Sequence, residues 1–335
     1  MPETKIMLLG LVVVFALGFD FINGFHDTAN AIATSVLTRA LSIRNAILLS
    51  AGMNMIGAMI WTGVAKTIGS GIIDPTTVSG STGQLLVLSA LIGAIIWNLA
   101  TWWLGLPSSS SHALIGGLIG AVVVAAGGGA LNMAGLHKIF TSLIFSPIAG
   151  FVGGSVLMII VMNIFAQQAP SRINRHFKVL QVFSALSMAF THGSNDAQKS
   201  MGIITMALVV AGMQGSVTVP LWVKISCATA MALGTAMGGW RIIKTVGKKI
   251  MGLHAVHGFA AETAAALVVL SATLWHAPVS TTHVISSSIM GVGSAKRLSA
   301  VRWGIVGQIL LAWMMTLPTS AVLGALCYVV LSRVL

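Results

Sequence analysis

The chain carries one polar motif twice, as GFHDTAN at residues 24–30 and as GSNDAQK at residues 193–199. A second motif follows each copy, PSSSSH at residues 107–112 and PVSTTH at residues 278–283. The motifs recur in the same order at offsets of 169 and 171 residues. This recurrence predicts an internal duplication, in which each half of the chain repeats one structural plan.

Composition indicates that lipid surrounds most of the chain. The 335 residues are 56% hydrophobic and 7% charged, whereas a soluble domain carries about 25% charged residues. The apolar segments are long and continuous and lack the alternation of barrel strands, so we expect an all-α polytopic membrane protein. The net charge of +12 comes from basic residues in short loops between these segments. Membrane topology explains that pattern, and nucleic-acid binding does not.

The basic loops also predict how the two halves are oriented. If both termini lie outside the membrane, the basic loops at residues 39–44, 172–178, 241–249 and 296–302 all face the cytoplasm. The loop at 39–44 corresponds to an uncharged loop at 212–220, so equivalent loops lie on opposite sides. We expect two inverted-topology repeats, residues 1–166 and 179–335, joined by a cytoplasmic linker at residues 167–178. This plan is common among secondary transporters of the plasma membrane.

A few acidic side chains lie within the apolar segments, where an isolated charge costs roughly 2.5–3.5 kcal/mol. Asp27 and Asp196 occupy matched positions of the two repeats, which favours a shared function over a buried structural clamp. Glu262 lies in a later segment, and Asp20 lies two turns before Asp27. Glycine beside Asp, Asn and His predicts a broken helix at the first motif of each half. Carboxylates and exposed carbonyls at such a break suit a proton or a small cation.

The second motif predicts the start of a helix in each half. Proline ends one helix, and a run of hydroxyl side chains caps the next. Free N–H groups and the helix dipole at both starts would attract an anion. If the two tips converge at mid-membrane, their neutral donors can surround a tetrahedral oxyanion and still release it. The candidate binding residues are Ser109, Ser110, Ser111, Ser280, Thr281 and Thr282, with His112 and His283 closing the tips.

Further side chains of the first motif complete the candidate site. Asn195 and Gln198 are candidates for binding the oxyanion, and His26 is a candidate proton carrier. Lys199 stands where the first repeat has Asn30, three residues after the acid on one helical face. Its ammonium could replace a bound cation, attract the oxyanion directly, or form only a structural ion pair.

Together these motifs resemble those of the inorganic phosphate transporter (PiT) family, of the bacterial low-affinity phosphate permease type. The resemblance covers the whole chain. Residues 24–30 resemble the first signature of the family, residues 192–202 the second, and residues 107–112 and 278–283 its paired hairpin tips. It implies a duplicated inverted fold with re-entrant helical hairpins, an oligomer that we expect to be a homodimer, and cation-coupled import of phosphate.

The resemblance also implies roles for individual residues. Asp27, Asn30 and Asp196 would hold the coupled cation, a proton or Na⁺, and the hydroxyl tips would line the phosphate. Glu262 resembles a functional acid of the second half. Lys199 and Asn54 depart from relatives that use sodium, and both changes make the site less negative, so we favour proton coupling. We expect phosphate to travel free or as a metal complex, and we expect no cofactor besides the coupled ion.

Three alternatives remain open at this point. The same fold could carry sulfate in place of phosphate. Serine, histidine and aspartate could form an intramembrane hydrolase, although the serines come in runs and no Gly-x-Ser-x-Gly elbow is present. A channel would show flux without saturation. The duplication favours a symmetric transport site over a single nucleophile, so we expect a transporter and not an enzyme.

Overall fold

The computed structural model describes residues 2–334 except 76, 77, 79, 239–241, 244 and 247–249. The described part is helical apart from an isolated bridge between Ile73 and Leu131, as expected. Part of the basic loop at 241–249, namely Arg241, Lys244, Lys248 and Lys249, lies outside the described residues. The helices are α1 (Pro2–Leu37), α2 (Ile43–Ala58), α3 (Gly63–Gly71), α4 (Gly80–Leu104), α5 (Ser110–Ala126), α6 (Met133–Ile164), α7 (Pro170–Val210), α8 (Leu221–Met237), α10 (Ala255–Leu274), α11 (Thr281–Lys296) and α12 (Trp303–Val334), with 3-10 turns η1 (Gly128–Ala130) and η3 (Leu298–Ala300).

Several helices are long and apolar enough to cross a bilayer. Among the described residues there are five, in α1, α4, α6, α10 and α12, and a sixth if the bent pair α2 and α3 counts as one span. The 41-residue α7 is not among them, because the polar side chains of its central turns lower its hydropathy. It begins at Pro170, inside the expected linker at 167–178.

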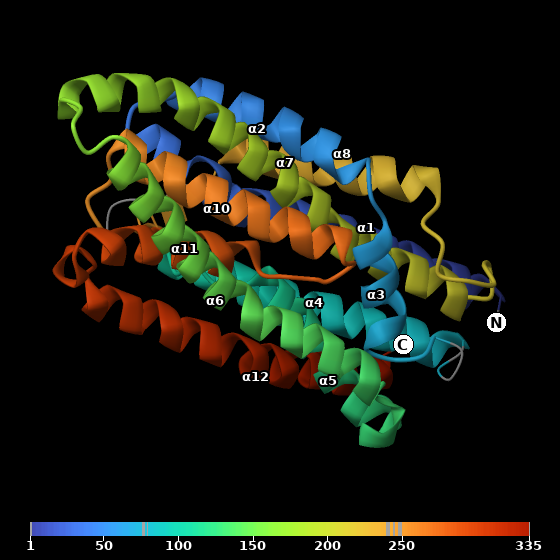
Figure 1. The fold of residues 1–335 in the computed structure, drawn as a ribbon. Helices are drawn as coiled ribbons and strands as arrows, with labels where there is room; N and C mark the ends of the chain where they lie inside the picture. Colours follow the sequence, from blue (N-terminus) through green and yellow to red (C-terminus); the bar gives the residue numbers. More distant parts are fainter. Residues whose placement is uncertain are drawn as a thin grey trace.

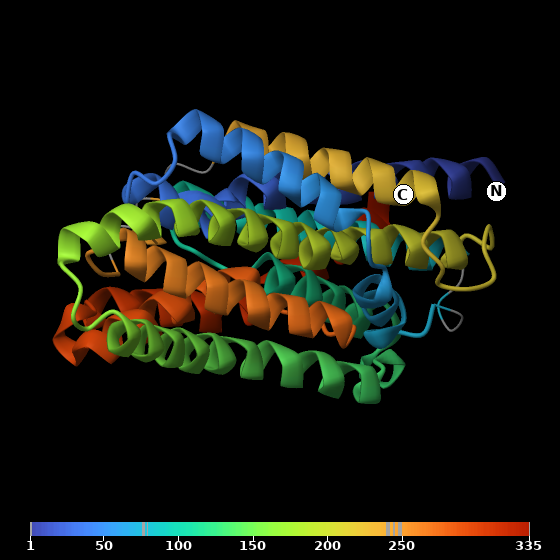
Figure 2. The same cartoon turned by 45° about the horizontal axis from the view of Figure 1, so that its top comes forward.

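The long helices lie side by side, and both chain termini lie toward the same end of the bundle (Figures 1 and 2). The α5–α6 and α7–α8 connections lie toward that end as well. The α1–α2, α6–α7 and α11–α12 connections, which hold the other basic loops, lie at the opposite end. The described basic loops therefore share one end of the molecule.

Helices of the two halves pack against each other in reciprocal pairs. In the motif region, α1 packs on α8 and α7 packs on α2. The same exchange occurs after the second motif, where α5 packs on α12 and α11 packs on α6. Between these pairs α1 crosses α7 in an antiparallel direction, because Asp20 bonds Ser200 near one end and Thr38 bonds Gln181 near the other.

The expectation of a broken helix at each first motif is wrong. Helices α1 and α7 continue without interruption through residues 24–30 and 193–199. The glycines allow close packing instead. A methyl group on Gly24 would overlap the backbone carbonyl of Met231 in α8, and one on Gly193 would overlap the backbone carbonyl of Asn54 in α2. The sharp bend lies elsewhere, between α2 and α3, which meet at 71°.

Candidate functional site

A buried polar stripe runs along α1 and faces α7. Its side chains recur every three or four residues, the spacing of one helical face. In chain order they are Asp20, Asn23, Asp27, Asn30, Thr34 and Thr38, and all but the half-buried Thr38 are buried. Because the helix is unbroken, the stripe is continuous along the C-terminal half of α1 and brings polar groups on both sides of Asp27 into line with it.

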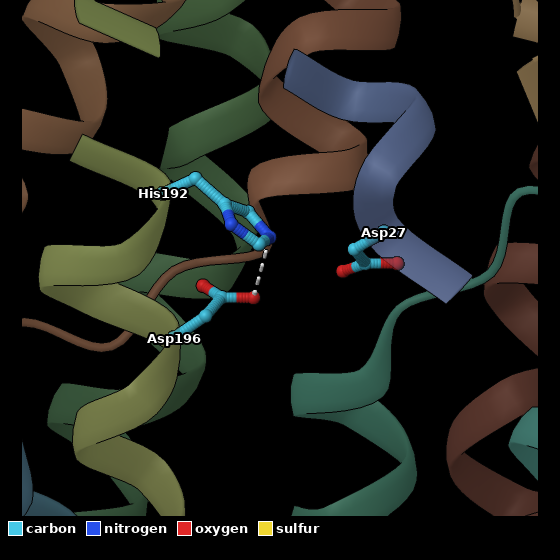
Figure 3. A group of neighbouring side chains, drawn as sticks. All are labelled: Asp27, His192 and Asp196. Carbon is cyan, nitrogen blue, oxygen red and sulfur yellow. Dashed lines mark ion pairs between the residues drawn. The ribbon is translucent and has the colours of Figure 1, made fainter. Parts of the chain in front are cut away.

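Three ionisable side chains meet at the centre of this stripe (Figure 3). Asp27 on α1 faces His192 and Asp196 on α7, and their ligand atoms all lie within 4.8 Å of one another. Nε2 of His192 lies 3.6 Å from Oδ2 of Asp196. The carboxylates are 2% and 1% exposed. Two buried carboxylates and an imidazole nitrogen this close together form a set of ligand atoms that suits a proton or a small cation.

The two hydroxyl-rich tips converge beside these acids, as expected. Ser109 caps α5 by accepting the His112 N–H, and Ser280 caps α11 by accepting the His283 N–H, each at 3.2 Å. The Ser111 hydroxyl donates to the Val279 carbonyl at 2.9 Å. The imidazole centroids of the two histidines lie 4.7 Å apart. Segments about 170 residues apart in sequence therefore form one buried junction.

The tips also contact the acids directly. Ser110 of the first tip donates to Asp27 at 3.4 Å, and Thr281 of the second tip donates to Asp196 at 3.2 Å. Asn30 of α1 donates to Thr282 at 2.9 Å. Hydroxyl donors and carboxylates therefore share one buried space, where an oxyanion and a cation can sit next to each other.

Lys199 is wholly buried and is bound to the second acid. Its ammonium lies 2.7 Å from Oδ1 of Asp196. The other oxygen of this carboxylate accepts from Thr281, and Asn23 lies 3.5 Å from it. Lys199 therefore pairs a basic side chain with one of the two central acids.

Two residues expected to bind the oxyanion have other partners. The Asn195 carbonyl accepts the Val279 N–H at 3.3 Å and so holds the second tip in place. The Gln198 carbonyl accepts the N–H groups of Val64 and Ala65 at 2.8 and 3.2 Å. Gln198 thus caps α3, whereas the Asn195 side chain positions the second tip by bonding the backbone of Val279.

The outer acids lie away from the centre. Asp20 accepts from Ser200 at 2.6 Å, seven residues before Asp27 on α1. Glu262 accepts from the hydroxyls of Thr34 and Ser184, so it meets α1 seven residues beyond Asp27. Both acids are buried, one toward each end of the stripe.

One residue at the centre, Asn23, was missed by the sequence analysis, whereas His26 and Asn54 were identified there. Asn23 contacts Asp196, and the Asn54 carbonyl accepts from His192 at 3.0 Å, which fixes the imidazole. His26 lies 2.7 Å from Asp27 through Nδ1 and 3.2 Å from Thr101 through Nε2. The regular spacing of polar residues along α1 would have identified Asn23, had the segment been taken as an unbroken helix.

The family model "Phosphate transporter family" matches residues 23–324, a range that includes every residue of the site except Asp20. The chain belongs to the phosphate transporter family. A Bacillus subtilis protein named "Probable low-affinity inorganic phosphate transporter" is 53% identical and aligns over 99% of both chains. A protein of the same name from Rhizobium meliloti is 48% identical over 96% of both chains.

A solved structure also resembles this member of the phosphate transporter family. It is named "The sodium-dependent phosphate transporter", and it matches with a TM-score of 0.88 and 25% identity over 98% of this chain and all of the other. Family membership makes the chain a multi-pass membrane transporter and not an enzyme. The hydrolase alternative is therefore wrong: the serine runs cap helices and do not supply a nucleophile.

Proposed function

We propose that this chain imports inorganic phosphate across the plasma membrane as a cation-coupled symporter. The observation that carries the proposal is the junction of two hydroxyl-capped helix starts against two buried carboxylates. The names of the relatives agree on phosphate as the substrate. A proton or cation carried on the acids would offset the charge of the phosphate in a buried space.

Phosphate would bind between the tips through neutral donors. Ser110, Ser111, Thr281 and Thr282 supply hydroxyl groups, and the starts of α5 and α11 supply N–H groups and the positive ends of two helix dipoles. Ser109 and Ser280, which cap these helices, position the donors. The donors would rearrange as phosphate enters, because Ser111 now bonds the facing tip.

The coupled cation would bind at Asp27, Asn30 and Asp196, with Glu262 and Asp20 as further acids on its route. We favour a proton, because Lys199 already places a positive charge on one of the two central acids. The sodium dependence named for the solved relative belongs to a protein 25% identical to this one. Na⁺ remains the alternative ion.

Alternating access would follow from two inverted repeats, residues 1–166 and 179–335. The reciprocal packing of α1 on α8 and α7 on α2, and the antiparallel crossing of α1 and α7, support this relation. The basic loops gathered at one end support a cytoplasmic location for that end and an outside location for both termini. The homodimer stays a prediction.

Proteoliposomes with the full-length chain test the proposal. Uptake of radiolabelled phosphate should rise with an inward proton gradient, and less or not at all with an inward sodium gradient. Asp27→Asn and Asp196→Asn should each abolish uptake. Uptake that ignores both gradients, or that survives both substitutions, would reject coupled symport.

Sulfate, another tetrahedral oxyanion, is the second candidate substrate. An excess of unlabelled sulfate should leave phosphate uptake largely unchanged. Phosphate changes its charge near neutral pH whereas sulfate does not, so competition is measured at several pH values. Strong inhibition by sulfate at every pH would favour a sulfate permease. Repeating uptake with and without Mg²⁺ distinguishes free phosphate from a metal complex.

A further inference from the structure

The two halves present the same pair of positions to the site but fill them differently. An acid is followed three residues later by Asn30 in α1 and by Lys199 in α7. Both positions recur at an offset of 169 residues, and both side chains are buried. The antiparallel crossing of the two helices brings these positions to opposite sides of one centre.

The first position offers an open oxygen. The amide nitrogen of Asn30 is used, because it donates to Thr282 at 2.9 Å. Its carbonyl Oδ1 is buried and finds no hydrogen-bond partner among the described residues. A buried amide oxygen one turn from the Asp27 carboxylate is a fitting ligand pair for a small hard cation.

The second position, that of Lys199, offers no oxygen to a cation. The Lys199 ammonium lies 2.7 Å from Oδ1 of Asp196, the place that a bound cation would take beside this carboxylate. The remaining oxygen, Oδ2, faces Thr281, Asn23 and His192. The Asp196 carboxylate is thus already paired with an ammonium, whereas the Asp27 carboxylate contacts His26 and Ser110.

We propose that Lys199 is a tethered cation that fills the cation position of the second half. The site then binds one mobile cation fewer per transport cycle than it would if both halves carried asparagine at this position. This deepens the proposed symport and depends on it for the transport consequence. The neighbouring charged and titratable groups are Asp20, Asp27, Asp196, His26, His112, His192 and His283.

Lys199→Asn tests the inference, because it gives the second half the side chain that the first half has. Purified full-length protein is unfolded thermally in detergent with either NaCl or choline chloride. Sodium should raise the melting temperature of Lys199→Asn by several degrees more than that of the wild type, and the variant should bind one more ²²Na⁺ per chain. Lys199→Arg keeps the charge and should show no such gain in sodium stabilisation or ²²Na⁺ binding.

Transport gives an independent measure. At steady state each additional coupled ion raises phosphate accumulation by about tenfold for a tenfold gradient of that ion. Lys199→Asn should therefore show a steeper dependence on the sodium gradient than the wild type. If wild-type vesicles accumulate no phosphate, the proposed function fails, while the sodium-binding result still decides the role of Lys199.

Two results would overturn the inference. One is a monodisperse Lys199→Asn protein that gains neither sodium stabilisation nor ²²Na⁺ binding. The other is an equal gain in Lys199→Arg. If Lys199→Asn does not fold, the converse variant Asn30→Lys serves: it should lose one coupled ion relative to the wild type, and an unchanged ion dependence would reject a tethered cation.

Discussion

Replacing Asp196 by Asn should damage the protein by stranding the Lys199 ammonium, and the damage should be repaired by neutralising both partners. The pair is 2.7 Å long and both side chains are at most 1% exposed. Removing one member of a buried ion pair costs about 3–5 kcal/mol. Releasing a proton from an ordinary lysine at pH 7 costs about 4–5 kcal/mol. Because the stranded amine can lose its charge at that cost, the loss of stability should not exceed about 4–5 kcal/mol.

The assay is a double-mutant cycle on thermal stability. Asp196→Asn should lower the melting temperature by roughly 10 °C. The double variant Asp196→Asn/Lys199→Met removes both charges and should recover most of that loss. Together with the single variant Lys199→Met, the cycle should give a coupling of about 2–3 kcal/mol. Asp27→Asn is the matched control. Its carboxylate bonds a histidine and a serine instead of a lysine, so its loss should be only about 1–3 kcal/mol.

Transport separates this stability effect from function. The double variant should be stable and still inactive in phosphate uptake, because Asp196 is needed for coupling as well as for pairing. Two results would refute the reasoning. A double variant no more stable than Asp196→Asn would show that the pair is not coupled, and one that transports normally would remove Asp196 from the mechanism.

Three further substitutions and one control substitution test the packing and the tips. Gly24→Ala should cost about 1–3 kcal/mol, because its methyl group would meet the backbone of α8. Gly18→Ala on the same helix meets open space and should gain about 0.5–1 kcal/mol; equal melting temperatures would contradict the close approach of α1 and α8. Ser280→Ala removes the cap of α11 and should cost about 1 kcal/mol with a raised KM for phosphate, so an unchanged KM would separate the cap from the substrate. Gln198→Ala leaves two N–H groups at the start of α3 without their acceptor and should cost about 1–3 kcal/mol at an unchanged KM; a raised KM at an unchanged melting temperature would return Gln198 to the phosphate site.

The helix starts at the second motif could be predicted because the signal is local. Proline ends a helix and serine or threonine caps the next one within a few residues, whatever surrounds them. Ser109 and Ser280 accordingly cap α5 and α11. The matched positions of Asp27 and Asp196 were likewise visible as a repeat, and both acids lie at the centre of the site.

The prediction of a break in α1 and in α7 was wrong, and the reason is packing between helices. Glycine at residues 24 and 193 permits two different outcomes, a relaxed backbone or a close approach of another helix. Which outcome occurs depends on Met231 and Asn54, which are distant in sequence. Local propensity contains no information about these partners.

The chain's order of residues was enough to predict a helical membrane protein, its hydroxyl-capped helix starts and the repeated positions of its buried acids, because hydropathy, capping and repetition can be read over short stretches or by plain comparison. The partner of each polar group was decided by the fold. The turn of α7 directs Gln198 to the start of α3 and Lys199 to Asp196, while Asn30 keeps a carbonyl oxygen unpaired. Neighbouring residues on a helix point in different directions, and only the arrangement of the surrounding helices determines what each one meets.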